Sequence, residues 1–118
     1  MTTAFATTFA KDWISSWNAH NLEEILNHYS DDIEITTPMI KMALGEETGT
    51  LKGKVAVADY WKKALDKLPD LHFELYNVAI GVDSITLYYK SVMNKKAMEV
   101  MFFNRDGKVF KMIAHYTE

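Results

Sequence analysis

The chain has 118 residues, a formal net charge of −3 and an apolar content of 48%, which suits one domain, residues 1–118, with a full hydrophobic core. It contains no cysteine, so disulfides, thiol nucleophiles and cysteine-ligated metals are excluded. The acidic balance argues against nucleic acid as a partner, because binders of nucleic acid usually carry a basic surplus.

The first residues give no sign of export. No basic residue precedes Lys11, unlike the start of a secretory signal, and no apolar run is long enough to span a bilayer. We therefore expect a soluble, cytoplasmic protein that has no membrane partner.

Two helices are expected first. The earlier one carries aromatic residues every four positions, a spacing that places them on one helical face; they are Phe5, Phe9, Trp13 and Trp17. A shorter helix should follow Asn21, because Glu24 stands at the spacing of a capping box. Its apolar stripe comprises Leu22, Ile25, Leu26 and Tyr29.

The next segment predicts a strand, a loop and a third helix. "IEIT" after Asp32 alternates like a strand, and Thr37 continues one of its faces. Residues 38–53 contain three of the five glycines and are interpreted as a long loop. Its Met39 and Met42 either form a lid over a cavity or pack on the sheet edge. A helix with apolar residues at three-four spacing follows and ends at Pro69.

From Leu71 onward the chain alternates like strands. Segments 72–80, 84–93, 96–103 and 108–116 are the expected strands, and "NRDG" with Gly107 is a typical hairpin turn. Helices followed by antiparallel strands predict an α+β domain with the helices on one face of the sheet.

The strand at 97–103 is apolar on both faces. Met98, Val100 and Phe102 alternate with a second apolar set. A strand buried on both faces needs cover on both, and a second copy of the chain is the simplest cover for the outer one. We therefore predict a homodimer.

Several short motifs occur in the order typical of one family. They are "WNAHNLEEILNHYSDDIEITTP", "GTLKGK", "YWKKAL", "FNRDGKV" and "AHY". Together they resemble the SnoaL-like polyketide cyclase and ketosteroid isomerase group of the nuclear transport factor 2-like superfamily. The resemblance covers nearly the whole chain. It implies a cone, in which a curved antiparallel sheet wraps around N-terminal helices in the order α-α-β-α-β-β-β-β and encloses an apolar cavity. It also implies a dimer through the outer sheet face.

The steroid isomerases of that group use a tyrosine on the first helix, an aspartate base before a proline, and a protonated acid on a late strand. Matched by position, these roles fall on Trp13, Thr37 and Glu99. Threonine cannot take a proton from carbon near neutral pH, and tryptophan cannot ionise. We therefore expect no steroid isomerase activity by that mechanism.

Glu99 is the candidate catalytic residue. It shares a strand face with apolar residues, where a carboxylate is costly unless it is paired or protonated. The functional interpretation is a pocket acid with a raised pKa. The alternative is a structural ion pair or a solvated strand face.

The candidate ligand-binding residues are those that the resemblance places at or near the cavity. They are Trp13, Tyr29, Thr37, Tyr60, Met101, Met112 and Tyr116. For Trp61, ordinary core packing is favoured. No histidine has a metal-ligand spacing with another histidine or a carboxylate, and His28 is placed on the polar side of the second helix. We expect no metal and no cofactor.

Three functions stay open. The first is a cofactor-free isomerase, cyclase, dehydratase or hydrolase that acts on an apolar small molecule with Glu99 as acid. The second is a non-catalytic small-molecule binder, and the third is a dimeric interaction domain. An enzyme needs a second titratable group near Glu99, a binder needs only the apolar lining, and an interaction domain needs a cavity filled by side chains.

Overall fold

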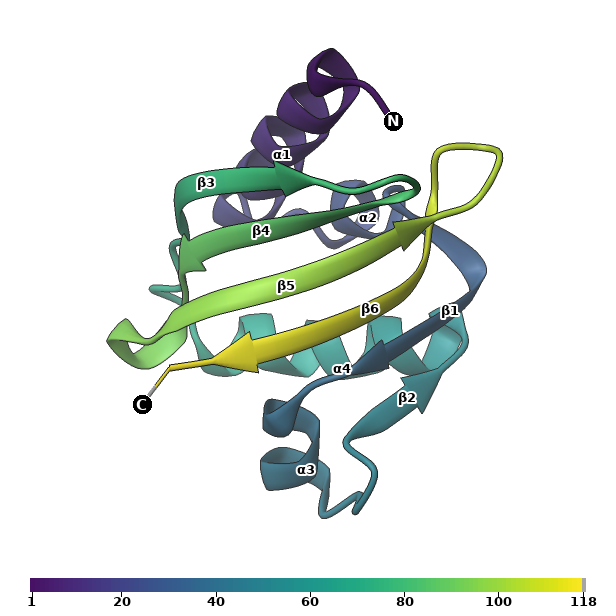
Figure 1. The fold of residues 1–118 in the computed structure, drawn as a ribbon. Coiled ribbons are helices and arrows are strands. Elements are labelled where there is room, and N and C mark those ends of the chain that lie inside the picture. Colours follow the sequence, from purple (N-terminus) through teal and green to yellow (C-terminus); the bar gives the residue numbers. More distant parts are fainter. Residues whose placement is uncertain (118) are drawn as a thin grey trace.

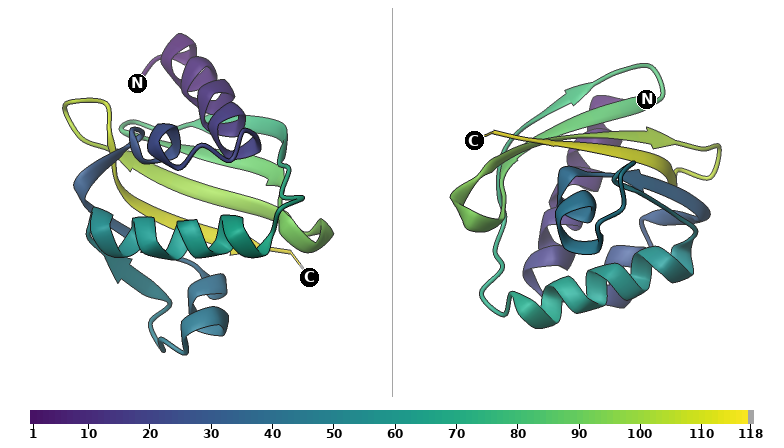
Figure 2. Two further views of the ribbon diagram at one scale, coloured as in Figure 1. Left: turned by 180° about the vertical axis from the view of Figure 1, so that it is seen from behind. Right: turned by 90° about the horizontal axis from the view of Figure 1, so that it is seen from below.

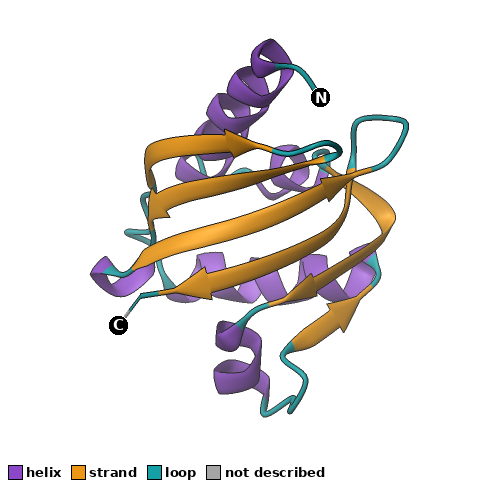
Figure 3. Cartoon of the chain, in the orientation of Figure 1, coloured by secondary structure: helices purple, strands orange, loops and turns teal. Residues whose placement is uncertain are grey.

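The helices and strands follow the predicted order (Figure 3). The structure adds one helix and one strand within residues 38–53, and a short 3₁₀ helix at residues 92–94. The helices are α1 (Thr3–Asn18), α2 (Leu22–Leu26), α3 (Pro38–Leu44), α4 (Lys54–Lys67) and the short 3₁₀ helix η1 (Val92–Asn94). The strands are β1 (Tyr29–Thr36), β2 (Thr50–Lys52), β3 (Glu74–Ile80), β4 (Ser84–Lys90), β5 (Lys96–Phe103) and β6 (Val109–Tyr116). The structure, a computed structural model, describes residues 1–117.

A single curved sheet organises the molecule. Its strand order is β2-β1-β6-β5-β4-β3, and α1, α2 and α4 lie on its concave side (Figures 1 and 2). This arrangement confirms the α+β prediction. Within residues 1–117, no helix is long and apolar enough to cross a membrane.

Local signals placed α1 and α2 correctly. The Thr2 side chain caps α1 by accepting a hydrogen bond from the Phe5 amide at 3.0 Å. The four-residue aromatic repeat of α1 faces the sheet, and from Phe9 onward its members are buried. Asn21 caps α2 as predicted, because its side chain accepts a hydrogen bond from the Glu24 amide at 3.1 Å.

Tyr29 belongs to β1, so its assignment to the stripe of the second helix is wrong. Helix α2 ends at Leu26, and β1 begins at Tyr29, earlier than predicted. The reason is a pairing distant in sequence: Tyr29 lies opposite Val109 of β6. The buried Tyr29 ring is thereby directed toward the core.

The interpretation of residues 38–53 as one long loop is wrong in part. The segment contains α3 and β2. Thr37 caps α3, since its hydroxyl accepts a hydrogen bond from the Met39 amide at 3.2 Å, and Pro38 occupies the favoured first helical position. After the helix, Gly49 packs against the Thr37 carbonyl so closely that a Cβ would lie 2.9 Å from its oxygen.

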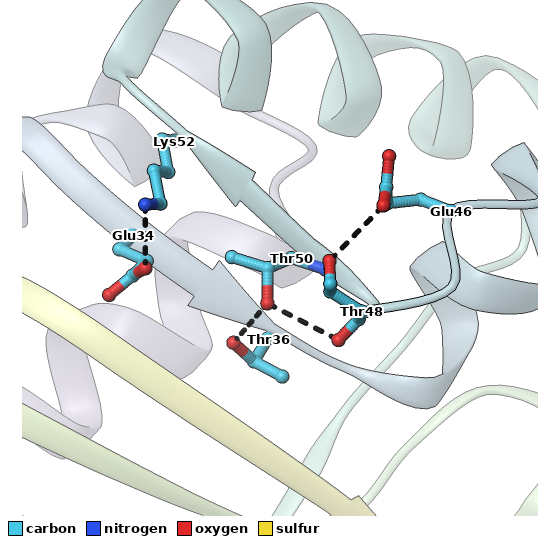
Figure 4. Close-up of polar contacts among 6 residues, drawn as sticks. All are labelled: Glu34, Thr36, Glu46, Thr48, Thr50 and Lys52. Atoms are coloured by element: carbon cyan, nitrogen blue, oxygen red, sulfur yellow. Dashed lines mark hydrogen bonds and ion pairs between the residues drawn. The ribbon is translucent and has the colours of Figure 1, made fainter.

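Polar contacts hold this segment against the edge of the sheet (Figure 4). The hydroxyls of Thr36 on β1 and Thr50 on β2 are 2.8 Å apart. Lys52 Nζ lies 3.6 Å from a carboxylate oxygen of Glu34. The strand pairing and these contacts fix the place of α3 at one end of the sheet.

The sheet is mixed, which corrects the prediction of a wholly antiparallel one. β1 pairs with β6 in parallel, and every other pair is antiparallel within the described residues. β1 and β6 are joined by most of the chain and not by a hairpin, so no short turn forces them to run in opposite directions. The hairpin between β5 and β6 is as predicted, with Gly107 at φ 73°.

Candidate functional site

A cavity of about 440 Å³ lies between the concave face of the sheet and the helices. Its volume is within the range of about 300–1,000 Å³ found for small-molecule sites. Aromatic side chains form much of its wall, including Trp17, Trp61 and Phe73. The exposed members of its lining come from α3, the end of α4 and η1. These elements therefore form the mouth.

The mouth is largely apolar although it faces solvent. Met42 on α3 is 75% exposed, and Leu44 and Met93 are also exposed. Lys63 and Lys67 on α4 are the charged side chains of this rim. Met39 and Met42 thus lie beside the cavity.

The structure brings the predicted site residues together, with one exception. Glu99 and six of the seven predicted ligand-binding residues line the cavity; these six are Trp13, Tyr29, Thr37, Tyr60, Met112 and Tyr116. Met101 is fully buried and does not line it. Beyond Glu99, core side chains such as Phe9 and Phe103 fill the inner face of β5. The centroids of these two rings lie 4.9 Å apart.

Strand register explains why Glu99 has no charged neighbour. Glu99 lies opposite Leu87 of β4 on one side and Ala114 of β6 on the other. Its side chain is buried, at 4% exposure, and it takes part in none of the ion pairs among the described residues. The carboxyl is therefore desolvated without a counter-charge.

Burial raises the pKa of the Glu99 carboxyl to about 8, and the hydrogen bond from Tyr89 opposes this rise. That bond is long, with 3.5 Å between the Tyr89 hydroxyl and Oε1, so it stabilises the charged form weakly. Oε2 is buried and has no hydrogen-bond partner among the described residues. At pH 7 the carboxyl is consequently neutral and can donate a hydrogen bond.

Three tyrosine hydroxyls surround this acid. Tyr89 and Tyr116 both lie opposite Ala97 in the sheet register, one pleat away from Glu99. Burial, followed by the nearby Glu99 charge, raises the pKa of Tyr29, Tyr89 and Tyr116. These hydroxyls stay protonated near neutral pH, so they act as hydrogen-bond donors and not as bases.

Several residues of the cavity wall were not predicted from the sequence. Tyr89, Phe73 and Ser91 line the wall, as does Trp61, for which core packing was favoured; Trp61 is both buried and part of the wall. Tyr89 carried a usable signal, because it alternates with the buried Leu87 on one strand face. Its contact with Glu99 needs the β4–β5 register, which the sequence does not reveal.

The histidines lie outside this cavity. His20 occupies the turn between α1 and α2, where its Nε2 lies 2.8 Å from the Leu71 carbonyl oxygen. His28 follows α2 and is half-buried against Phe9, which corrects its placement on the polar side of that helix. Burial lowers the pKa of His28. Residues 1–117 contain no group of three or more His, Cys, Asp or Glu side chains that could hold a metal ion.

The fold and cavity define a class of protein in which a curved sheet and helices enclose an apolar cavity. The model of the SnoaL-like domain matches residues 10–117. The chain therefore belongs to the SnoaL-like family, as its motifs predicted. No curated protein matches it in sequence.

Solved structures agree with this assignment. A SnoaL-like protein of unknown function from Burkholderia thailandensis is 45% identical over 99% of this chain and 98% of that one, with a TM-score of 0.97. A candidate isomerase of the SnoaL-like family from Agrobacterium tumefaciens is 13% identical, with coverage of 98% and 100% and a TM-score of 0.77. An NTF2-like protein of unknown function from Cytophaga hutchinsonii is 11% identical, with coverage of 92% and 86% and a TM-score of 0.71. The last two share the fold with this chain.

Proposed function

We propose that the chain binds an apolar small molecule in the cavity and presents Glu99 to it as a neutral carboxylic acid. The observation that carries this proposal is the desolvated carboxyl of Glu99, which faces an apolar cavity without a counter-charge. Burial of a carboxyl costs free energy, and such a cost at the wall of a pocket is typical of a functional acid.

The chemistry favoured by this site is acid-assisted isomerisation or cyclisation of an oxygen-bearing apolar molecule. A neutral carboxyl can donate a hydrogen bond to oxygen as negative charge develops there. A fold-level argument points the same way, because one structural neighbour is a candidate isomerase.

Non-catalytic binding is the second candidate, and one observation favours it. The other titratable groups close to Glu99 are the three tyrosines, whose pKa values are raised, so none can serve as a base near neutral pH. A cavity that side chains leave open suits both candidates better than a purely structural interaction domain.

Thr37 supports the exclusion of the steroid isomerase mechanism. Its hydroxyl is engaged as the cap of α3, and the position that would hold the base carries no carboxylate. We propose that the chain does not isomerise β,γ-unsaturated ketosteroids, which a spectrophotometric assay for the conjugated product would check.

Ligand binding can be tested by thermal unfolding with a series of aryl ketones. We expect a saturable rise in Tm, because a ligand that binds only the native state stabilises it by RT ln(1 + [L]/Kd). Ala64→Phe is the matched variant, since Ala64 lies in the cavity wall and is half-buried, and the larger side chain should reduce the rise. An unchanged Tm of the wild type with every ketone, up to its solubility limit, would contradict the proposal.

We further propose that the outer sheet face forms a homodimer. Met98 is 46% exposed there, and Phe110 is also exposed, while Val100 and Phe102 are half-buried. Large apolar side chains gathered on one sheet face are typical of an interface.

A further inference from the structure

The charged side chains that line the cavity are unevenly placed. Glu99 is the one acidic residue among the described lining residues, and it is buried in the wall. The basic lining residues are Lys63 and Lys67, which are exposed on α4 at the mouth. They are four positions apart on this helix, so they lie side by side on one of its faces. Within the described lining, the charge at the mouth is therefore positive.

Both lysines can pair with a charge on a bound molecule. Lys67 takes part in none of the ion pairs found within residues 1–117. Lys63 Nζ lies 3.0 Å from a carboxylate oxygen of Asp59, but the two side chains are 67% and 66% exposed. An exposed pair of this kind contributes little to stability. An anion of a ligand can therefore share Lys63 with Asp59 or replace Asp59 as its partner.

The surroundings of these lysines suit an apolar body attached to such an anion. Leu68 follows Lys67 at the end of α4, while Met42 on α3 and Met93 on η1 also line the mouth. Farther inside, aromatic side chains form much of the wall. A molecule with an apolar body in the cavity and a charged end at the rim would match both parts.

The reverse orientation of such a molecule is unfavourable. An anion at the inner wall would lie near Glu99, where no basic side chain lines the cavity in the described part of the chain. Burying an ion without a counter-charge costs far more free energy than leaving it at a solvated rim. The charge of the molecule therefore belongs at the mouth.

We propose that the ligand of this cavity is amphipathic, with its apolar body inside and one anionic group, such as a carboxylate, held at the mouth by Lys63 and Lys67. The inference rests on the proposed function, because it concerns the ligand of the same cavity. It narrows the ligand class from apolar small molecules to organic acids with an apolar body. The alternative is that the two lysine stems only cover apolar surface, as long charged side chains often do.

The test uses ω-(2-naphthyl)alkanoates of increasing tether length, each compared with its primary amide, which has nearly the same shape and no charge. Titration calorimetry at pH 7 measures both dissociation constants. We expect the wild type to bind the best-fitting carboxylate about tenfold more tightly than its amide, because two exposed ion pairs contribute about threefold each. High salt should reduce this preference, since it screens exposed charges.

Methionine substitutions separate the charge of each lysine from its apolar stem. Lys63→Met and Lys67→Met should each lower the preference for the carboxylate about threefold, and the double variant should abolish it. Binding of the amide should change less than about twofold. Lys62→Met is the control, because Lys62 is exposed on the same helix, does not line the cavity and pairs with Asp66. It should leave the preference unchanged.

Three results would overturn the inference. If carboxylate and amide bind the wild type equally, or if the preference for the carboxylate survives in the double variant, the two lysines hold no anion, while the proposal of a ligand pocket stands. The inference also fails alone if no carboxylate binds although an aryl ketone raises the Tm. If no carboxylate, amide or aryl ketone binds the wild type, the proposed function and this inference fail together.

Discussion

At the scale of single residues, Glu99 is the side chain whose burial is unfavourable in free energy. Its sheet neighbours Leu87 and Ala114 are apolar, and its carboxyl receives one long hydrogen bond. Replacement by an apolar residue would remove this cost, so stability alone does not explain a carboxyl here. Its place in the cavity wall agrees with the proposed role as a pocket acid.

The desolvation of the Glu99 carboxyl predicts how the free energy of unfolding depends on pH. The pKa of Glu99 is raised from 4.5 to about 8 in the folded chain. Between these values the unfolded chain has lost a proton that the native chain keeps, so rising pH favours unfolding by up to about 1.4 kcal/mol per pH unit. The stabilising effect of the protonated group is complete below pH 4.5 and lost by about pH 8.

The variant Glu99→Gln does not titrate. We expect its free energy of unfolding, measured with urea, to exceed that of the wild type at pH 8 and to approach it near pH 5. Glu74→Gln, which changes an exposed carboxylate on β3, is the control and should show no such trend. A constant difference between Glu99→Gln and the wild type over this pH range would rule out the raised pKa.

At the scale of elements, α3 is the piece that completes the mouth of the cavity. The helix has seven residues, too few to be stable alone, so its cap at Thr37 matters. Thr37→Val removes the hydroxyl that accepts the Met39 amide, at a cost of about 1 kcal/mol. We expect amides of residues 40–44 to exchange hydrogen about fivefold faster.

Thr37→Ser keeps a capping hydroxyl and should preserve most of the protection of α3. Both variants are compared by hydrogen exchange with mass spectrometry. Equal exchange of this segment in Thr37→Val and the wild type would show that packing, and not the cap, holds the helix.

The sequence predicts elements well where their signals are local. The aromatic repeat of α1 and the Asn21 cap lie within a few turns of the residues that they organise, and both were confirmed. Thr37 followed by Pro38 was also a local signal for α3, but the glycines after it favoured a loop. The alternation around Glu99 left a buried and a solvated side chain open, and the structure shows a buried one.

Other features depend on contacts between distant residues. Tyr29 joins β1 because it pairs with Val109, and nothing near Tyr29 specifies that partner. The hydrogen bond from Trp13 Nε1 to the Tyr29 hydroxyl and the Tyr89–Glu99 contact likewise require the packing of α1 and the strand registers. Met101 shows the same limit of prediction from sequence. The alternation along the strand indicates on which face of the sheet Met101 lies, but it does not indicate where along that face the cavity ends.

At the scale of the whole molecule, the sheet separates the two surfaces for which we propose different roles. Helices cover its concave face (Figure 2) and the cavity lies between them and the sheet, while the proposed dimer face lies on the other side. Met98 lies on that outer face, opposite Tyr88 of β4 and His115 of β6 in the register. Dimerisation would bury these side chains without closing the mouth, which is formed by α3, α4 and η1.

Light scattering at micromolar concentration tests the dimer. We expect twice the chain mass of 13.6 kDa for the wild type. Met98→Glu places a charge in the proposed interface and should yield a monomer, whereas Val55→Glu, at an exposed position on α4, should remain dimeric. A monomeric wild type at high concentration would contradict the proposal.

The proposed function depends on a neutral carboxylic acid in an apolar pocket at pH 7. The most direct measurement is a ¹³C NMR titration of the glutamate side-chain carboxyls, with the Glu99 resonance assigned by its absence in Glu99→Gln. We predict a midpoint of about 8 for this resonance, raised from the ordinary pKa of 4.5 by burial. A midpoint at or below 4.5 would make Glu99 a charged, solvated or paired side chain, and would contradict the proposed acid.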